Sequence, residues 1–250
     1  MFQQHESSPF GSSRGPFGAS RYQYQSLPYG YEQAQAGRLI SKVMLLLALA
    51  FLVATVGSVV GFALVASIGL ATFWLGAIGG LVVLLILNFT IQVSGWNLVL
   101  LNLFAFLEGM SLAPLLDAYL TTGYGDLLGE AFVITALTSL CLAVYAWTTK
   151  RDFSRLGDYL FFGLILLLVA GLAGLFFQSL FQTPLIAIAI SVVGIVIFCG
   201  YILYYVQRAR YMADTLPNAI GLTVSIFVTV LNLFLYVLEL LTVLGGRRRR

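Results

Sequence analysis

Ala219–Leu244 is a nearly uninterrupted apolar segment of 26 residues close to the end of the chain. An α-helix rises about 1.5 Å per residue, so the segment is long enough to cross the roughly 30 Å hydrocarbon core of a bilayer. It therefore predicts a membrane-spanning helix, and the rest of the chain has to fold around it.

A stripe of polar side chains follows one face of this segment. Its members are Ser225, Thr229, Asn232, Tyr236 and Glu239, at spacings of four, three, four and three residues. These spacings keep all five on one side of a helix. Lipid offers no hydrogen-bond partners, so the stripe is expected to face protein or enclosed water, while Leu233 faces lipid or outer helices. The last helix is therefore predicted to be the centre of a bundle.

The rest of the chain is also too apolar for a soluble protein. Hydrophobic residues make up 60% of the 250 residues and charged residues only 9%, whereas soluble domains carry about 25% charged residues. Long apolar runs with short polar connections predict an all-α integral membrane protein of seven transmembrane helices, the last of which the polar stripe places at the centre. The expected spans are 43–64, 70–91, 97–119, 128–148, 159–177, 184–206 and 219–244.

Two segments flank the expected transmembrane domain of residues 39–246. Residues 1–38 are rich in Gln, Ser, Gly, Tyr and Phe, contain three prolines and lack an apolar run. Such a segment cannot bury enough surface to fold alone, so it is expected to be a disordered cytoplasmic tail. Residues 247–250 are four arginines and form a basic C-terminal tail.

The basic residues of the connections indicate the orientation in the membrane. They cluster before the first span, between the fourth and fifth spans (Lys150, Arg151 and Arg155) and between the sixth and seventh (Arg208 and Arg210). Because Lys and Arg concentrate in cytoplasmic connections, these three regions predict a cytoplasmic N-terminus. Seven crossings then place the C-terminal arginines outside, against the same rule. The larger number of basic residues in the three regions decides the prediction.

Glu108 lies near the middle of the third expected span, close to Ser111 and Pro114. A charged carboxylate inside a bilayer costs about 3 kcal/mol or more, so Glu108 is expected to be protonated, paired or exposed to a water-filled cavity. Either it is a functional acid, or it is a structural residue bonded to a neighbouring helix. Pro114 leaves one backbone carbonyl without its helical partner and predicts a kink or a backbone site for water or an ion. Glu108 and Ser111 are therefore candidate pore or polar-core residues, in addition to the five residues of the stripe.

Residues suited to catalysis or cofactor binding are scarce. His5, the only histidine, lies in the expected tail, and Cys141 and Cys199 lie in apolar runs without the spacing of a metal or redox motif. The net charge of +3 comes from connections and the C-terminal arginines, so it indicates topology rather than a nucleic-acid partner. We expect a protein that is not an enzyme and that has no cofactor and no bound metal.

The string Gly123-Tyr124-Gly125-Asp126 matches the GxGD motif of intramembrane aspartyl proteases. That chemistry needs a second aspartate facing the first within the bilayer. Here the string lies in a polar turn, and the nearest other aspartate, Asp117, belongs to the same connection. The string is therefore interpreted as a turn.

Four short landmarks follow one another along the chain. They are EGMSLAP at 108–114, TTKRDFSRLG at 148–157, GYILYY at 200–205 and LNLF at 231–234. In this order and together with seven spans, they resemble the Bax inhibitor / YccA family over about residues 40–245, and the second landmark is most similar to the bacterial YccA branch. The resemblance implies six helices around a central seventh, in agreement with the polar stripe.

The resemblance also implies candidate functions. Members of this family are linked to pH-sensitive calcium leak, to suppression of cell death and, in the YccA branch, to restraint of the membrane-bound FtsH protease. In calcium-leak members an acidic pair closes the pore, and the corresponding positions here are Tyr205 and Thr229. Neither titrates as a carboxylate, so the diaspartyl switch does not carry over.

The sequence and the resemblance support two alternative functions. The first is a non-enzymatic YccA-like protein of the bacterial inner membrane, which modulates an FtsH-type protease or a membrane stress response through helix and tail contacts. The second is a leak path for calcium, another cation or a small solute, which uses Glu108, Ser111, Tyr205 and the stripe of the last helix. The expected partners are therefore the lipid bilayer, the protease and, for the second function, the cation.

Overall fold

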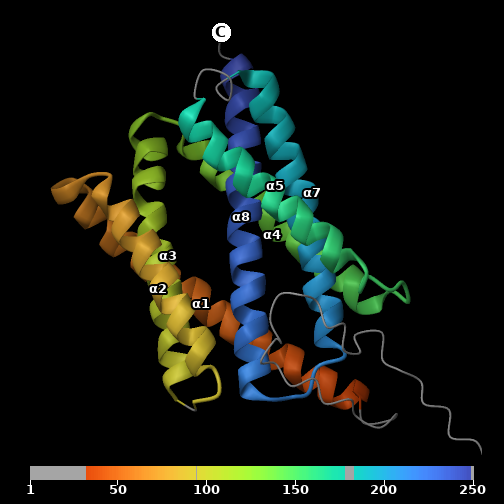
Figure 1. The fold of residues 1–250 in the computed structure, drawn as a ribbon. Coiled ribbons are helices and arrows are strands. Elements are labelled where there is room, and N and C mark those ends of the chain that lie inside the picture. Colours follow the sequence, from red (N-terminus) through yellow and green to blue (C-terminus); the bar gives the residue numbers. More distant parts are fainter. Residues whose placement is uncertain (1–31, 94, 178–182, 249–250) are drawn as a thin grey trace, which may run out of the picture.

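The computed structural model describes residues 32–93, 95–177 and 183–248 (Figure 1). The regular elements of these residues are α-helices: α1 Glu32–Ile68, α2 Ala71–Thr90, α3 Trp96–Thr121, α4 Gly125–Thr148, α5 Leu156–Phe176, α7 Pro184–Ala209 and α8 Leu216–Arg248. All seven are long and apolar enough to cross a membrane. The prediction of an all-α membrane protein with seven spans is confirmed.

The first and last helices extend furthest beyond the expected spans. α1 begins at Glu32, inside the segment expected to be a tail, and α8 continues through Gly245 to Arg248. Leu39 and Val43 are fully buried in a cluster with residues of α7 and α8. Because this contact stabilises the first turns of α1, the helix forms ahead of the apolar run. The remainder of the expected N-terminal tail, residues 1–31, lies outside the described residues.

α8 runs through the middle of the bundle (Figure 1). It packs directly on α7, α1, α4 and α3, whereas α2 packs on α3 and α1, and α5 packs on α7. Its side chains enter two buried clusters. One contains Phe227 together with residues of α1, α2 and α3, and the other contains Leu233 together with residues of α1, α4, α5 and α7. The last helix therefore joins the two halves of the bundle, together with α1, which also enters both clusters.

Small residues allow α3 to pack closely on α1 and α2. A Cβ at Gly57 of α1 would lie 2.1 Å from the Phe106 carbonyl oxygen, and one at Gly76 of α2 would lie 2.7 Å from the backbone nitrogen of Ser111. Such contacts between small residues bring helix backbones together in membranes. Pro114 lies inside α3, and α3 remains one continuous helix from Trp96 to Thr121.

The connections between the helices lie at two opposite ends of the bundle. The turn after α2, the α4–α5 connection, the α7–α8 connection and the described beginning of α1 lie at one end, and the α3–α4 turn and the end of α8 lie at the other (Figure 1). Gly123 occupies the α3–α4 turn with φ of +79°, and Asp126 follows in the first turn of α4. The interpretation of the GxGD string as a turn agrees with this geometry.

Candidate functional site

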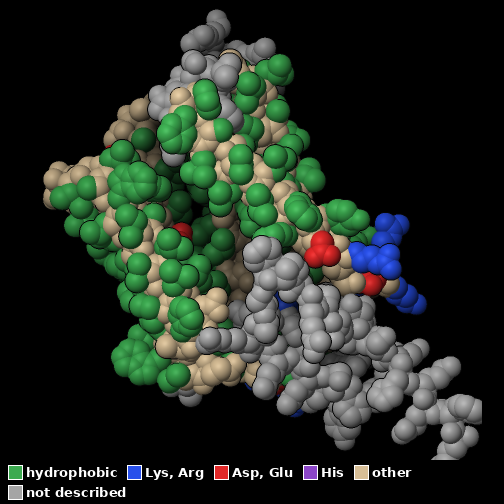
Figure 2. All heavy atoms as spheres, in the orientation of Figure 1, with side chains coloured by type: hydrophobic (Ala, Val, Ile, Leu, Met, Phe, Trp, Pro, Cys, Tyr) green, Lys and Arg blue, Asp and Glu red, His purple; other side chains and the backbone are tan. Residues whose placement is uncertain are grey.

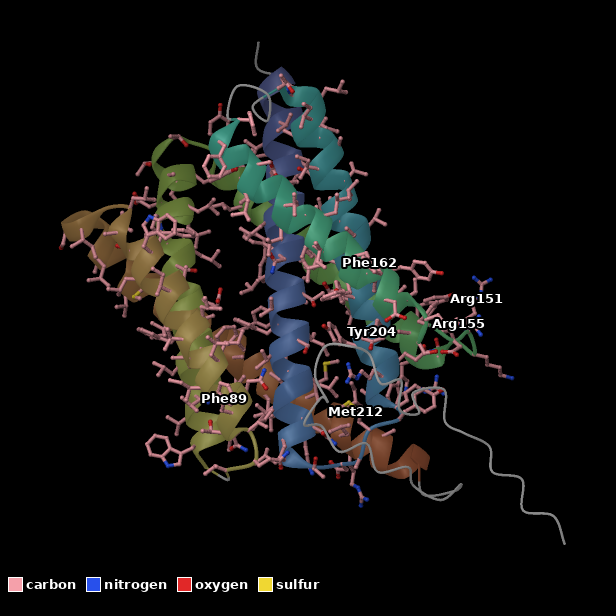
Figure 3. All side chains as sticks on the ribbon, in the orientation of Figure 1. Phe89, Arg151, Arg155, Phe162, Tyr204 and Met212 are labelled. Carbon is pink, nitrogen blue, oxygen red and sulfur yellow. The ribbon has the colours of Figure 1, made fainter. Side chains whose placement is uncertain are left out.

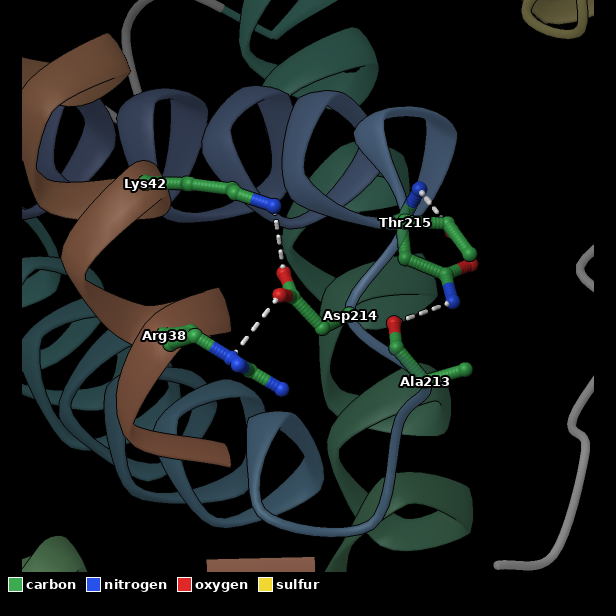
Figure 4. Close-up of polar contacts among 6 residues, drawn as sticks. Arg38, Lys42, Ala213, Asp214 and Thr215 are labelled. Carbon is green, nitrogen blue, oxygen red and sulfur yellow. Dashed lines mark hydrogen bonds and ion pairs between the residues drawn. The ribbon is translucent and has the colours of Figure 1, made fainter. Parts of the chain in front are cut away.

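The α7–α8 connection is tied to α1 by an acidic residue between two basic ones (Figure 4). Lys42 Nζ donates to Asp214 Oδ1 at 2.8 Å, and Arg38 Nε lies 3.6 Å from Asp214 Oδ2. The Asp214 side chain is only 12% exposed. Asn218 Nδ2 donates to the Ala213 carbonyl at 2.9 Å, which fixes the chain where α8 begins. These contacts bring two of the three basic regions of the sequence to the same end of the bundle.

The α4–α5 connection is held at this end by two residues near the end of α7. Gln207 is 2% exposed, and its Oε1 accepts a hydrogen bond from the Phe153 amide at 2.5 Å while its Nε2 donates to the Arg151 carbonyl. Arg210 Nη1 donates to the Thr149 carbonyl at 3.2 Å. The connection is therefore fixed, and Arg151 and Arg155 project away from the helices (Figure 3). All three basic regions lie together, as the topology prediction requires.

The polar stripe of α8 uses its hydrogen-bond donors within the helix. Ser225 Oγ donates to the Gly221 carbonyl at 2.9 Å, Thr229 Oγ1 to the Ser225 carbonyl at 2.7 Å, and Asn232 Nδ2 to the Val228 carbonyl at 2.8 Å. Hydroxyl and amide oxygens keep lone pairs after such bonds. This face of α8 therefore offers the side-chain oxygens of Ser225, Thr229 and Asn232 as acceptors, and the second N–H of the Asn232 amide as a donor.

A cavity of about 340 Å³ lies against this face. It is lined by residues of α2, α5, α7 and α8 and by Ile91 directly after α2, and these residues carry no formal charge. They are Leu84, Leu87, Asn88, Ile91, Leu164, Phe198, Tyr201, Tyr205, Gly221, Val224, Ser225, Val228, Thr229 and Asn232. The cavity therefore brings together Tyr205, Ser225, Thr229 and Asn232, four of the eight candidates from the sequence.

Aromatic rings form the α7 wall of the cavity. The rings of Tyr201 and Tyr205 stack with centroids 5.5 Å apart and an interplanar angle of 15°. Phe198, one turn earlier, stacks on Tyr236 of α8 with centroids 5.7 Å apart. Tyr201 is 7% exposed and belongs to the cavity lining. The ring wall thus contributes a phenol to the cavity.

The other candidates lie elsewhere. Glu108 and Ser111 are at the α2–α3 contact, where Glu108 Oε1 lies 3.1 Å from the Cβ position of Gly80 and Ser111 Oγ donates to the Glu108 carbonyl at 2.7 Å. Tyr236 packs on Gly194 of α7, outside the cavity lining. Glu239 is exposed near the end of α8. The stripe is therefore divided: Ser225, Thr229 and Asn232 line the cavity, whereas Tyr236 and Glu239 lie outside its lining.

The expectation that Leu233 faces lipid is wrong. Leu233 is fully buried and belongs to the cluster that joins α8 to α7 and α4. A central helix has neighbours on several sides, so its apolar face is covered as well as its polar one.

Two polar residues of the cavity were not among the candidates from the sequence, Tyr201 and Asn88. Tyr201 precedes Tyr205 by four residues, and Asn88 interrupts an apolar span. Both could therefore have been recognised as candidates from the sequence.

Comparison with known proteins identifies relatives over most of the chain. The family described as inhibitor of apoptosis-promoting Bax1 matches residues 37–248. An uncharacterized protein of Campylobacter jejuni is 34% identical over 206 residues, which cover 81% of this chain and 87% of the relative. The modulator of FtsH protease YccA of Escherichia coli is 36% identical over 152 residues, 60% of this chain and 65% of YccA. The Golgi anti-apoptotic protein of vaccinia virus is 31% identical over 147 residues, 59% of this chain and 58% of the relative.

Proposed function

The chain belongs to the family of inhibitors of apoptosis-promoting Bax1, and from this membership we propose that it is a YccA-like protein of a bacterial inner membrane that modulates an FtsH-type protease. The similarity to YccA, a modulator of FtsH protease, carries the proposal. The seven apolar helices agree with a multi-pass membrane protein. The protein acts by contact and catalyses no reaction of its own.

The α4–α5 connection is the surface that we assign to this contact. Lys150, Arg151 and Arg155 are exposed there, and Gln207 holds the backbone beneath them. Basic side chains gather on this projection in the space-filling view, with acidic side chains beside them (Figure 2). A connection whose backbone is already held in place loses less conformational entropy on binding, and its basic side chains favour recognition of an acidic partner surface.

Reconstitution with a protease tests the proposal. The full chain and purified FtsH of Escherichia coli are placed in the same liposomes, and the degradation rate of a membrane substrate is measured. We expect the chain to slow degradation, and we expect the triple variant Lys150→Gln, Arg151→Gln, Arg155→Gln to slow it less. The matched control is Glu130→Gln at the opposite end of the bundle. Degradation that is unaffected by the wild-type chain would refute the proposal.

The second candidate is a leak path for calcium or another cation. The observation that supports this candidate is the position of Glu108, which lies beside Gly80 in the middle of α3. Glu108 does not line the cavity, however, so the polar stripe and the acid belong to two separate places. Calcium flux into liposomes that contain the chain alone separates the two functions. Flux that Glu108→Gln abolishes favours the leak path, and the absence of flux favours the modulator.

A further inference from the structure

The cavity beside α8 is open toward the bilayer. α2 and α5 form two of its walls but do not pack on each other. Asn88 of α2 and Leu164 of α5, which line these walls, are both exposed. A molecule dissolved in the membrane can therefore reach the cavity from the side.

The cavity walls select for a neutral molecule. No lining residue is acidic or basic, so an ion would lose its hydration there without a charged partner to compensate. The volume of about 340 Å³ is within the range of small-molecule sites, which are mostly apolar with a few well-placed polar groups.

The polar groups of the cavity match a hydroxyl group. Thr229 has used its donor within α8 and presents an oxygen acceptor, while Asn232 presents its amide oxygen and the second N–H of its amide. The Tyr201 phenol, also in the cavity lining, can donate as well. A hydroxyl donates one hydrogen bond and accepts others. The stacked rings of Tyr201 and Tyr205 add a flat surface on which an aromatic ring packs favourably.

We propose that this cavity binds a neutral hydroxylated aromatic amphiphile of the alkylphenol or hydroquinone class. The ring lies against Tyr201 and Tyr205, the hydroxyl donates one hydrogen bond to the oxygen of Thr229 or Asn232 and accepts one from an amide or phenol of the cavity wall, and the alkyl chain leaves between α2 and α5 into the bilayer. This site is independent of the proposed contact with a protease, because it uses none of the residues of the α4–α5 connection.

Photolabelling of the full chain in phosphatidylcholine nanodiscs tests this site. The probe is 4-octylphenol with a diazirine in its alkyl chain, and labelled peptides are identified by mass spectrometry. We expect saturable labelling on α2, α5, α7 or α8, with 4-octylphenol competing at least about tenfold better than octylbenzene, which lacks the hydroxyl. Equal competition by octylbenzene, or displacement of the probe by calcium chloride, would overturn the proposal.

Two threonines of α8 provide matched variants. Thr229 lines the cavity, and Thr223 is fully buried outside it, with its hydroxyl likewise bonded four residues back, to the Ala219 carbonyl at 2.8 Å. Thr229→Val should weaken probe binding about two- to tenfold, the effect of one neutral hydrogen bond, and Thr223→Val should leave it unchanged. Leu164→Trp, at the exposed rim, should reduce labelling without disturbing the core. Equal loss in both threonine variants, or unchanged labelling in Leu164→Trp, would refute the site.

Discussion

Gly109 of α3 lies directly against Ala54 of α1: a Cβ on Gly109 would be 1.9 Å from the Ala54 carbonyl oxygen. Neither backbone can move away without separating the two helices. We expect Gly109→Ala to lower the free energy of unfolding by about 3 kcal/mol, the upper end of the usual cost of added volume. Thermal unfolding in detergent measures the effect. Gly129→Ala, where a Cβ meets nothing within 4 Å, is the control, and equal melting of the two variants would contradict the prediction.

The buried position of Leu233 leads to a second prediction. Leu233→Ala should lower the free energy of unfolding by about 2–5 kcal/mol, since it leaves a cavity in the core. Leu166 of α5 is 64% exposed, so Leu166→Ala should have a much smaller effect. The two variants remove the same atoms and are compared by detergent thermal unfolding. Equal destabilisation would mean that α8 does not occupy the centre of the bundle.

Gln207 should control the mobility of the α4–α5 connection. Gln207→Leu keeps the approximate size of the side chain but leaves the Phe153 amide without its acceptor, at a cost of about 1–3 kcal/mol. Hydrogen exchange should become faster at Phe153 and in the rest of the connection, and slow exchange there would disagree with the prediction. Gln92→Leu, at an exposed site after α2, serves as the control.

The Asp214 ion pairs should contribute modestly to stability. Lys42 and Arg38 are largely exposed, and such pairs are worth up to about 1 kcal/mol and weaken as salt rises. Asp214→Asn should therefore lower the melting temperature slightly at low salt and less at high salt. A double-mutant cycle with Lys42→Met isolates the shorter pair. A coupling energy that does not depend on salt would argue against an electrostatic contribution.

The orientation of the bundle can be measured by cysteine accessibility. In a background with Cys141→Ser and Cys199→Ala, single cysteines replace Gln92 at the basic end and Thr122 at the opposite end. Both positions are exposed. A membrane-impermeant maleimide should label Thr122→Cys in intact cells and Gln92→Cys only after permeabilisation, because basic connections remain cytoplasmic. The reverse pattern would invert the proposed topology.

Much of the architecture could be predicted because the bilayer restricts the possible solutions. An apolar run of sufficient length has to be a helix, so seven runs predicted seven helices. The spacing of Ser225, Thr229 and Asn232 then indicated a polar face that protein covers. The helix bounds beyond the membrane were harder to predict. α1 begins early because Leu39 and Val43 pack on helices that are distant in the sequence.

The composition of the cavity could not be predicted from the chain alone. Periodicity shows which residues share a face of one helix, but not which faces of two helices meet. Gly57, Gly76 and Gly109 set the depth at which α1, α2 and α3 pack, and this depth separates Glu108 from the stripe of α8. The burial of Leu233 could not be predicted for the same reason, because an apolar helix face has the same sequence pattern whether lipid or another helix covers it.

The central position of α8 has a consequence for biogenesis. α8 follows α1 to α7 in the chain, so these helices enter the membrane before the helix on which α1, α3, α4 and α7 pack has been synthesised. Until then the inner faces of both halves, including the surfaces that cover Phe227 and Leu233, are exposed to lipid or to the insertion machinery. A chain that stops before α8 lacks the centre of its fold rather than a peripheral helix, and synthesis of α8 is therefore the step that commits this protein to its native assembly.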